Sequence, residues 1–135
     1  MIRAIAVGML ALACAAAGRA QTAADTATGP TVEQVTICTG IADKEPVGAA
    51  ETFPASVGQL CCYTKVVGAK DTMTIQHKWF HGNELRGTIS LPVKAATWRT
   101  YSRKMIVEMW TGAWHVDVVD AASGKILGVA NFTVQ

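Results

Sequence analysis

The residues of this chain best suited to chemistry are its three histidines. His77 and His81 are four positions apart, the spacing with which two histidines on a helix bind one zinc ion. Their segment alternates apolar and polar residues, however, which is the period of a strand, and four strand residues span roughly 13 Å. Two imidazoles at that distance cannot share an ion. We therefore predict no metal site, and we expect His77 to be a hydrogen-bonded, partly buried side chain.

The third histidine, His115, lies two positions from a carboxylate, Asp117, so both would share one side of a strand. The residues between and beside them are apolar, and we expect the pair to face solvent. A hydrolase would also need an activated nucleophile and an oxyanion site, and no serine lies in a Gly-x-Ser-x-Gly turn. The carboxylates Asp43, Glu45 and Glu51 lack the ordered spacing of a calcium loop. The sequence predicts no catalytic residue, no cofactor and no enzymatic activity.

The four tryptophans divide into two pairs. Trp79 and Trp114 are in register with apolar neighbours, which predicts that both fill the core. Trp98 and Trp110 fall at predicted strand ends beside polar residues, where an aromatic ring could contact a sugar or a proline-rich peptide, or could seal the end of the fold. The candidate ligand-binding set is Trp98, Arg99, Tyr101 and Trp110.

Residues 1–20 have the features of an export signal. Arg3 is followed by an apolar stretch too short to span a bilayer, and small residues precede a cleavage site at Ala20. Alternatively, the exported protein could be lipidated at Cys14, and it would be attached to a membrane only in that case. Residues 21–31 are rich in alanine and threonine, which predicts a flexible linker before a domain at 32–135. We expect a periplasmic or extracellular protein, released rather than lipid-anchored.

Cleavage at Ala20 changes both the charge and the cysteine count. It removes two of the 12 Lys/Arg, leaving 12 − 2 = 10 against 10 Asp/Glu, a balance that argues against nucleic-acid binding. Three cysteines remain, and an odd number in an exported protein indicates one disulfide and one leftover thiol. Cys61 and Cys62 cannot easily bond to each other, so the bridge would join Cys38 to either of them. A disulfide that closes a loop of about 25 residues would stabilise the fold by roughly 3 kcal/mol.

Strand signals recur along residues 32–135, and no segment has the caps and 3.6-residue period of a helix. This pattern predicts an all-β, immunoglobulin-like β-sandwich of about seven antiparallel strands. The residues from Gly40 to Gly58 form an unusually long connection, which either contains a short edge strand or carries function. The seven predicted strands are residues 33–39, 60–67, 73–79, 85–93, 98–109, 114–118 and 126–134.

Several fragments of the sequence occur together in a recognisable order. They are Cys38, Asp43-x-x-Pro46, Phe53, His77-x-Trp79, Trp98-Arg99-Thr100-Tyr101-Ser102, Gly112-x-Trp114-x-Val116-x-Val118, Gly124 and Phe132-x-Val134. In combination they resemble one bacterial exported family, known as domain of unknown function 2914. The resemblance covers roughly Ile37 to Val134 and implies no established activity, so no functional residue is carried over. Cys62 resembles the family's strand cysteine and Cys61 an extra one, which implies a Cys38–Cys62 disulfide.

Together these observations predict a non-catalytic binding or assembly module of the bacterial envelope, whose partner is an envelope protein or a polysaccharide. A glycan-binding module that uses the strand-end aromatic residues is one alternative. A purely structural partner of another envelope protein is a second, which an exposed apolar edge or patch would favour.

Overall fold

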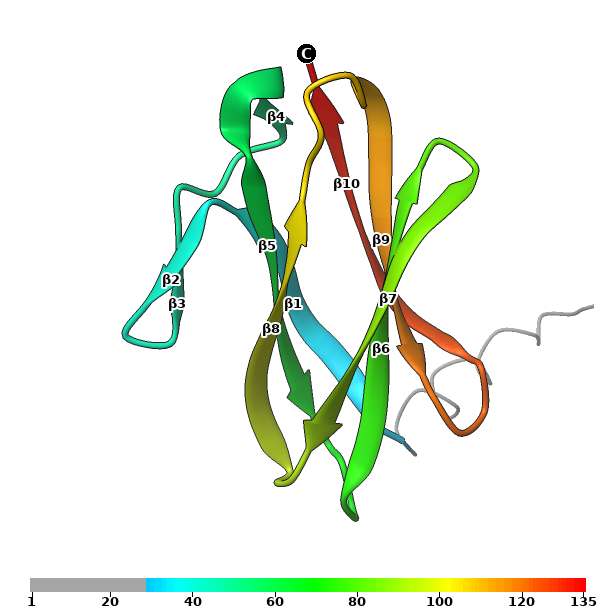
Figure 1. The fold of residues 1–135 in the computed structure, drawn as a ribbon. Coiled ribbons are helices and arrows are strands. Elements are labelled where there is room, and N and C mark those ends of the chain that lie inside the picture. Colours follow the sequence, from blue (N-terminus) through cyan, green and yellow to red (C-terminus); the bar gives the residue numbers. More distant parts are fainter. Residues whose placement is uncertain (1–28) are drawn as a thin grey trace, which may run out of the picture.

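The computed structural model describes residues 29–135, so the predicted signal, Cys14 and most of the predicted linker lie outside the described residues. The described chain is all-β, with ten strands and one short 3₁₀ helix (Figure 1). The elements are β1 (Thr31–Cys38), β2 (Gly40–Ala42), β3 (Glu45–Val47), β4 (Thr52–Phe53), η1 (Ala55–Val57), β5 (Gln59–Val67), β6 (Met73–His81), β7 (Glu84–Val93), β8 (Thr97–Met105), β9 (Gly112–Asp120) and β10 (Ile126–Val134).

The seven longest strands form the two sheets of a sandwich (Figure 1). One sheet has the order β1-β5-β8, and the other has the order β4-β10-β9-β6-β7. The long strands pair antiparallel within each sheet, and the two-residue β4 adds to β10 in parallel. This is the predicted immunoglobulin-like arrangement, and each predicted strand corresponds to one long strand.

The core lies between the two sheets, where alternate residues of each strand point inward. Trp79 and Trp114 are 0% and 1% exposed, which confirms their predicted place in the core. The Trp114 ring stacks on Phe132 with the ring centroids 5.7 Å apart. Burying side chains of this size contributes a large share of the apolar burial that drives folding.

A buried polar network crosses this core. The His77 ring nitrogens bind the hydroxyls of Thr64 (2.8 Å) and Ser102 (2.6 Å), which lie on the opposite sheet. The Trp79 indole N–H also donates to the Ser102 hydroxyl, at 3.2 Å. His77 is therefore hydrogen-bonded as predicted, but it is fully rather than partly buried. Burial lowers the pKa of His77 from 6.5 to about 4, so the ring is neutral at neutral pH.

The long connection at residues 40–58 contains short strands, which was the first of the two sequence expectations. β2 and β3 form a hairpin that lies on the outer face of the β1-β5-β8 sheet, away from the other sheet (Figure 1). β5 is consequently covered on both faces over its first half, which explains its continuous run of buried residues. Strands of only three residues, such as β2 and β3, contain too little alternation to be recognised in a sequence.

One predicted strand, residues 98–109, is too long. The strand β8 ends at Met105. The amide of Ile106 still donates to the Gly58 carbonyl at 2.9 Å, in the register of the β5–β8 ladder, and the chain then turns. The turn is closed by the Trp110 amide, which donates to the Val107 carbonyl at 2.8 Å. Trp110 therefore lies in the loop between β8 and β9 rather than at a strand end.

The predicted Cys38–Cys62 disulfide is not present, and the sheet register explains why. Cys38 lies directly opposite Cys61, whereas Cys62 lies opposite Ile37. Neighbours in a strand point to opposite faces, so Cys62 joins the core while Cys38 and Cys61 lie beneath the hairpin. The three cysteines within residues 29–135 are buried free thiols. Burial raises the pKa of Cys38 and raises that of Cys62 to about 12.

Among the described residues, no helix is long and apolar enough to cross a membrane.

Candidate ligand-binding site

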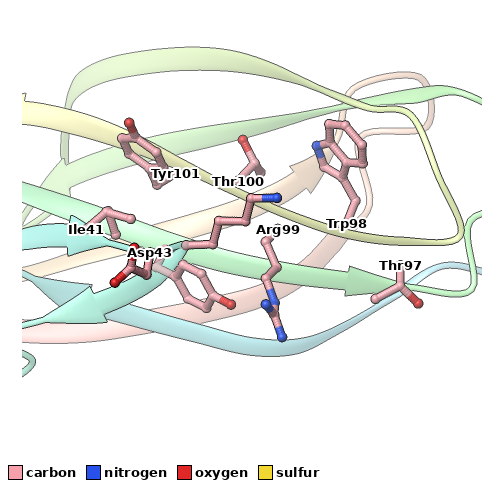
Figure 2. Close-up of a pocket in the computed structure, with 9 residues that line it drawn as sticks. Ile41, Asp43, Thr97, Trp98, Arg99, Thr100 and Tyr101 are labelled. Carbon is pink, nitrogen blue, oxygen red and sulfur yellow. The ribbon is translucent and has the colours of Figure 1, made fainter.

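A hollow of about 610 Å³ lies between the tip of the β2–β3 hairpin and strand β8 (Figure 2). Its volume falls in the range of small-molecule and peptide sites. The hairpin supplies one wall and β8 the other, and Tyr63 of β5 lies between them, 1% exposed. The lining residues are Ile41, Asp43, Lys44, Tyr63, Thr97, Trp98, Arg99, Thr100 and Tyr101.

The hairpin tip that borders the hollow has an unfavourable backbone conformation. Asp43 and Lys44 are the two central residues of the turn, with φ angles of 52° and 64°. Positive φ at both positions is the pattern of a type I′ turn, which twists in the same sense as the strands and usually contains Asn-Gly. Lysine in the left-handed region costs about 1–2 kcal/mol relative to its usual conformations. Backbone strain of this kind clusters at binding sites, where it fixes the direction of a side chain.

Charged side chains surround the hollow. The Arg99 guanidinium lies 3.5 Å from the Glu45 carboxylate, which links β8 to the hairpin. The Arg103 guanidinium lies 5.2 Å from the centre of the Tyr101 ring, within the range of a cation–π contact. Tyr101 is 39% exposed, so its ring is open to a ligand on the outer face of the sheet.

The structure brings together three of the four predicted ligand-binding residues. Trp98, Arg99 and Tyr101 all line the hollow, but the alternation of β8 sends them to different faces. The ring of Trp98 packs against the core cluster around Val66, and its side chain leaves the strand opposite to Arg99 (Figure 2). The Trp98 and Tyr101 rings therefore do not form one aromatic surface.

Trp110, the fourth predicted residue, is not at the hollow. Its ring lies between two cations, 4.6 Å from the Arg86 guanidinium and 5.6 Å from the Lys104 ammonium. Its carbonyl accepts a hydrogen bond from the Trp114 indole at 2.9 Å. This end of the sandwich also carries exposed apolar side chains on the β8–β9 loop and its flanks, among them Met105 and Met109 at 64% and 79%.

Sequence reasoning did not find the hairpin residues or Tyr63 as part of a site. Asp43 and Lys44 join β8 only through the packing of the hairpin on β5, which no local pattern indicates. The unbroken apolar run Leu60–Tyr63 was the available signal, because it indicates a strand buried on both faces and hence a covering element.

The remaining candidate residues have separate environments. His77 and His81 lie on strand β6, as the alternation predicted, but His77 is in the core while His81 stacks on Trp114 with the centroids 4.9 Å apart. His115 lies 3.7 Å from Asp117 and stacks on a phenylalanine. The pair lies on the face of β9 opposite the buried Trp114, Val116 and Val118, as predicted, with the two side chains 31% and 16% exposed. Over residues 29–135, no group of three or more His, Cys, Asp or Glu could hold a metal ion.

Comparison with known families adds one match. The C-terminal part of the chain fits a family described as "Protein of unknown function (DUF2914)". Residues 72–134 match DUF2914. The resemblance predicted from the sequence is confirmed for this segment, which begins after the predicted limit at Ile37. The DUF2914 segment includes β8 and its side of the hollow, but not the β2–β3 hairpin or Tyr63.

No curated protein matches the chain. Among solved structures, a β-glucosidase from Kluyveromyces marxianus is similar, with 14% identity and a TM-score of 0.45. The match covers 79% of this chain and 14% of the β-glucosidase. The chain thus spans only a small part of that enzyme, whose activity is not carried over.

Proposed function

We propose that this protein is a non-catalytic binding module of the bacterial envelope, and that it binds its partner in the hollow between the hairpin tip and β8. The observation that carries the proposal is the construction of the hollow. Two elements far apart in the sequence form it, one of them through a strained turn, and together they present Arg99 and the exposed Tyr101 ring. The partner is an envelope protein or a polysaccharide.

The proposed location is the periplasm or the exterior. It is supported by the signal-like features of residues 1–20 and by the resemblance to an exported bacterial family. The proposed absence of catalysis is supported by the surroundings of the histidines. His77 is closed inside the core, and His115 has a carboxylate neighbour but no serine or cysteine partner among its described contacts.

Binding to purified envelope material tests the proposal. Purified cell-wall sacculi and detergent-solubilised envelope proteins are offered to the protein at moderate salt, which screens weak ionic adhesion. We expect saturable binding, weakened by Tyr101→Ala and Arg99→Gln. Val129→Ala on β10 is a matched control, because Val129 is 44% exposed and does not line the hollow. If all three variants bind like the unmodified protein, the hollow is not the binding site.

The exposed Tyr101 ring favours a second candidate function, glycan binding. A sugar ring could stack on Tyr101 while Arg99 or Arg103 donates hydrogen bonds to its hydroxyls. In this case Tyr101→Ala should abolish affinity for a polysaccharide. Trp110→Ala should leave that affinity unchanged, because Trp110 lies away from the hollow. Loss of sugar binding in Trp110→Ala but not in Tyr101→Ala would contradict this assignment.

A further inference from the structure

We propose that the free edge of β8 binds an extended acidic peptide segment, which adds a fourth strand to the β1-β5-β8 sheet. This inference rests on the proposed function, since it names the ligand class of the same hollow. Strand addition obtains affinity from main-chain hydrogen bonds and selectivity from alternate side chains. The main-chain groups of β8, the side chains beside them and the shape of the hollow each support it.

The hydrogen bonds at the ends of the β5–β8 ladder show which main-chain groups reach the free edge. The Gly68 amide donates to the Ala96 carbonyl at 2.8 Å, and the Ile106 amide donates to the Gly58 carbonyl at 2.9 Å. In an antiparallel ladder, residue pairs that exchange hydrogen bonds alternate with pairs that do not. Gly68–Ala96 and Gly58–Ile106 are hydrogen-bonded pairs, so every second residue of β8 between them has its N–H and C=O directed away from β5. Within residues 29–135, no strand pairs with the other side of β8. The residues that turn their N–H and C=O groups to that side are Thr97, Arg99, Tyr101, Arg103 and Met105.

The side chains of the same residues point to the outer face at steps of about 7 Å. The Arg99 side chain is 41% exposed, and an exposed ion pair such as Arg99–Glu45 exchanges partners at little cost. Arg103 is exposed and has no carboxylate partner among the described residues. An added strand would place its own side chains directly beside these arginines. Carboxylates at alternate positions of the peptide would therefore pair with both.

The hollow borders β8 over five consecutive residues, Thr97–Tyr101. Their side chains alternate between two faces, so the main chain of β8 itself forms part of the wall. A peptide strand added to β8 would lie beside this hollow. The hairpin tip borders the same space, and its Lys44 adds a further cation.

A second copy of β8 fits this edge less well than an acidic peptide. Two-fold pairing centred on Tyr101 would set Arg99 of each copy opposite Arg103 of the other. Like charges directly opposite each other destabilise a sheet, and cations on an edge strand are a common protection against self-association. An acidic segment of another polypeptide meets neither obstacle.

The first test is a titration of the full chain with a blocked synthetic peptide, Thr-Glu-Val-Glu-Val-Glu-Val-Thr, followed by calorimetry and amide hydrogen exchange. We expect binding, and slower exchange of the Arg99, Tyr101 and Arg103 amides. Two matched peptides serve as controls. One has lysine in place of each glutamate, and the other is N-methylated at alternate amides. Each control should bind at least about tenfold more weakly than the acidic peptide. The lysine peptide loses the charge pairing, and the N-methylated peptide loses main-chain hydrogen bonds.

Two substitutions of Tyr101 separate main-chain from side-chain recognition. Tyr101→Pro removes an N–H that faces the free edge and spares the ladder with β5, whereas Tyr101→Ala keeps the N–H and removes only the ring. We expect Tyr101→Pro to bind the acidic peptide about tenfold more weakly than Tyr101→Ala does. Arg103→Glu, an exposed charge reversal that does not disturb the ladder, should reduce the preference for the acidic peptide over the lysine peptide, because Arg99 and Lys44 remain as the cations at the site.

Several results would overturn the inference. The N-methylated peptide or the lysine peptide could bind as tightly as the acidic peptide does. Alternatively, the acidic peptide could bind without protecting the amides of β8 from exchange. Self-association of the protein through β8, seen by size-exclusion chromatography and lost in Tyr101→Pro, would assign the edge to a second copy instead. If the acidic peptide fails while envelope material still binds and responds to Tyr101→Ala, only the strand-addition inference is wrong. If neither binds, the proposed function is wrong as well.

Discussion

Acid should destabilise this protein through His77, and the loss can be calculated from its environment. The ring is fully buried between two hydroxyls, and burial lowers its pKa from 6.5 to about 4. The unfolded chain therefore binds a proton near pH 6.5 that the folded chain accepts only near pH 4. The stability that this neutral histidine contributes is complete above pH 6.5 and is lost as the pH falls from 6.5 toward 4.

The difference between the two pKa values corresponds to about 3 kcal/mol below pH 4, at about 1.4 kcal/mol per pKa unit. At pH 5 the folded protein has lost about 2 kcal/mol of that amount. Urea unfolding followed by tryptophan fluorescence at pH 7.5, 6 and 5 measures the loss. The core position of Trp79 and Trp114 makes this signal sensitive to unfolding.

His77→Gln isolates the effect, since glutamine retains a donor and an acceptor but does not titrate. The variant is expected to be less stable at pH 7.5, and the difference between the two proteins should shrink by about 2 kcal/mol at pH 5. His115→Gln, at a partly exposed site, is the matched control for the loss of a histidine and should retain the loss of stability between pH 7.5 and 5 that His77 causes. A difference between the unmodified protein and His77→Gln that is constant with pH would refute this reasoning.

Three further changes should have defined effects. Lys44→Gly should raise the free energy of unfolding by about 1 kcal/mol in urea, because glycine adopts a φ of 64° without strain; no change would argue against strain at the turn. Gly48→Ala should lower it by more than about 1 kcal/mol, since φ is 73° and a Cβ there would collide with a neighbouring threonine hydroxyl; normal stability would contradict the tight contact. Mild oxidation should link Cys38 to Cys61, which are directly opposite at about 5.5 Å between Cα atoms; peptide mapping that finds a bridge to Cys62 would disprove the register.

Most of the main strands could be predicted from the sequence because one face of each is buried and the other is not, whereas β5 is buried on both faces over part of its length. Alternation in segments such as Met73–Trp79 reports this directly. The end of β8 was missed, since the apolar alternation continues past Met105 while the chain enters the turn closed by the bond from the Trp110 amide to the Val107 carbonyl. The residues of that turn continue the strand pattern, so the local sequence does not mark where β8 ends.

The candidate site was only partly predictable, for a related reason. Aromatic and cationic residues on β8 were visible as chemical types, but their faces depend on the register of the sheet. A shift of one residue exchanges the faces of a whole strand, so the sequence did not separate Trp98 from Tyr101, or Cys61 from Cys62. The hairpin wall depends on packing between distant segments and was beyond local reasoning.

The hairpin has a consequence for the thiols beneath it. It is held by few residue pairs and by a strained turn, so it should open locally before the sandwich unfolds. Each opening would uncover Cys38 and Cys61 and remove one wall of the hollow at the same time. If the proposed partner spans the hairpin tip and β8, its binding would stabilise the closed state, and its occupancy would set how fast a reagent or oxidant reaches the two sulfur atoms. The thiols would then report whether the proposed site is filled.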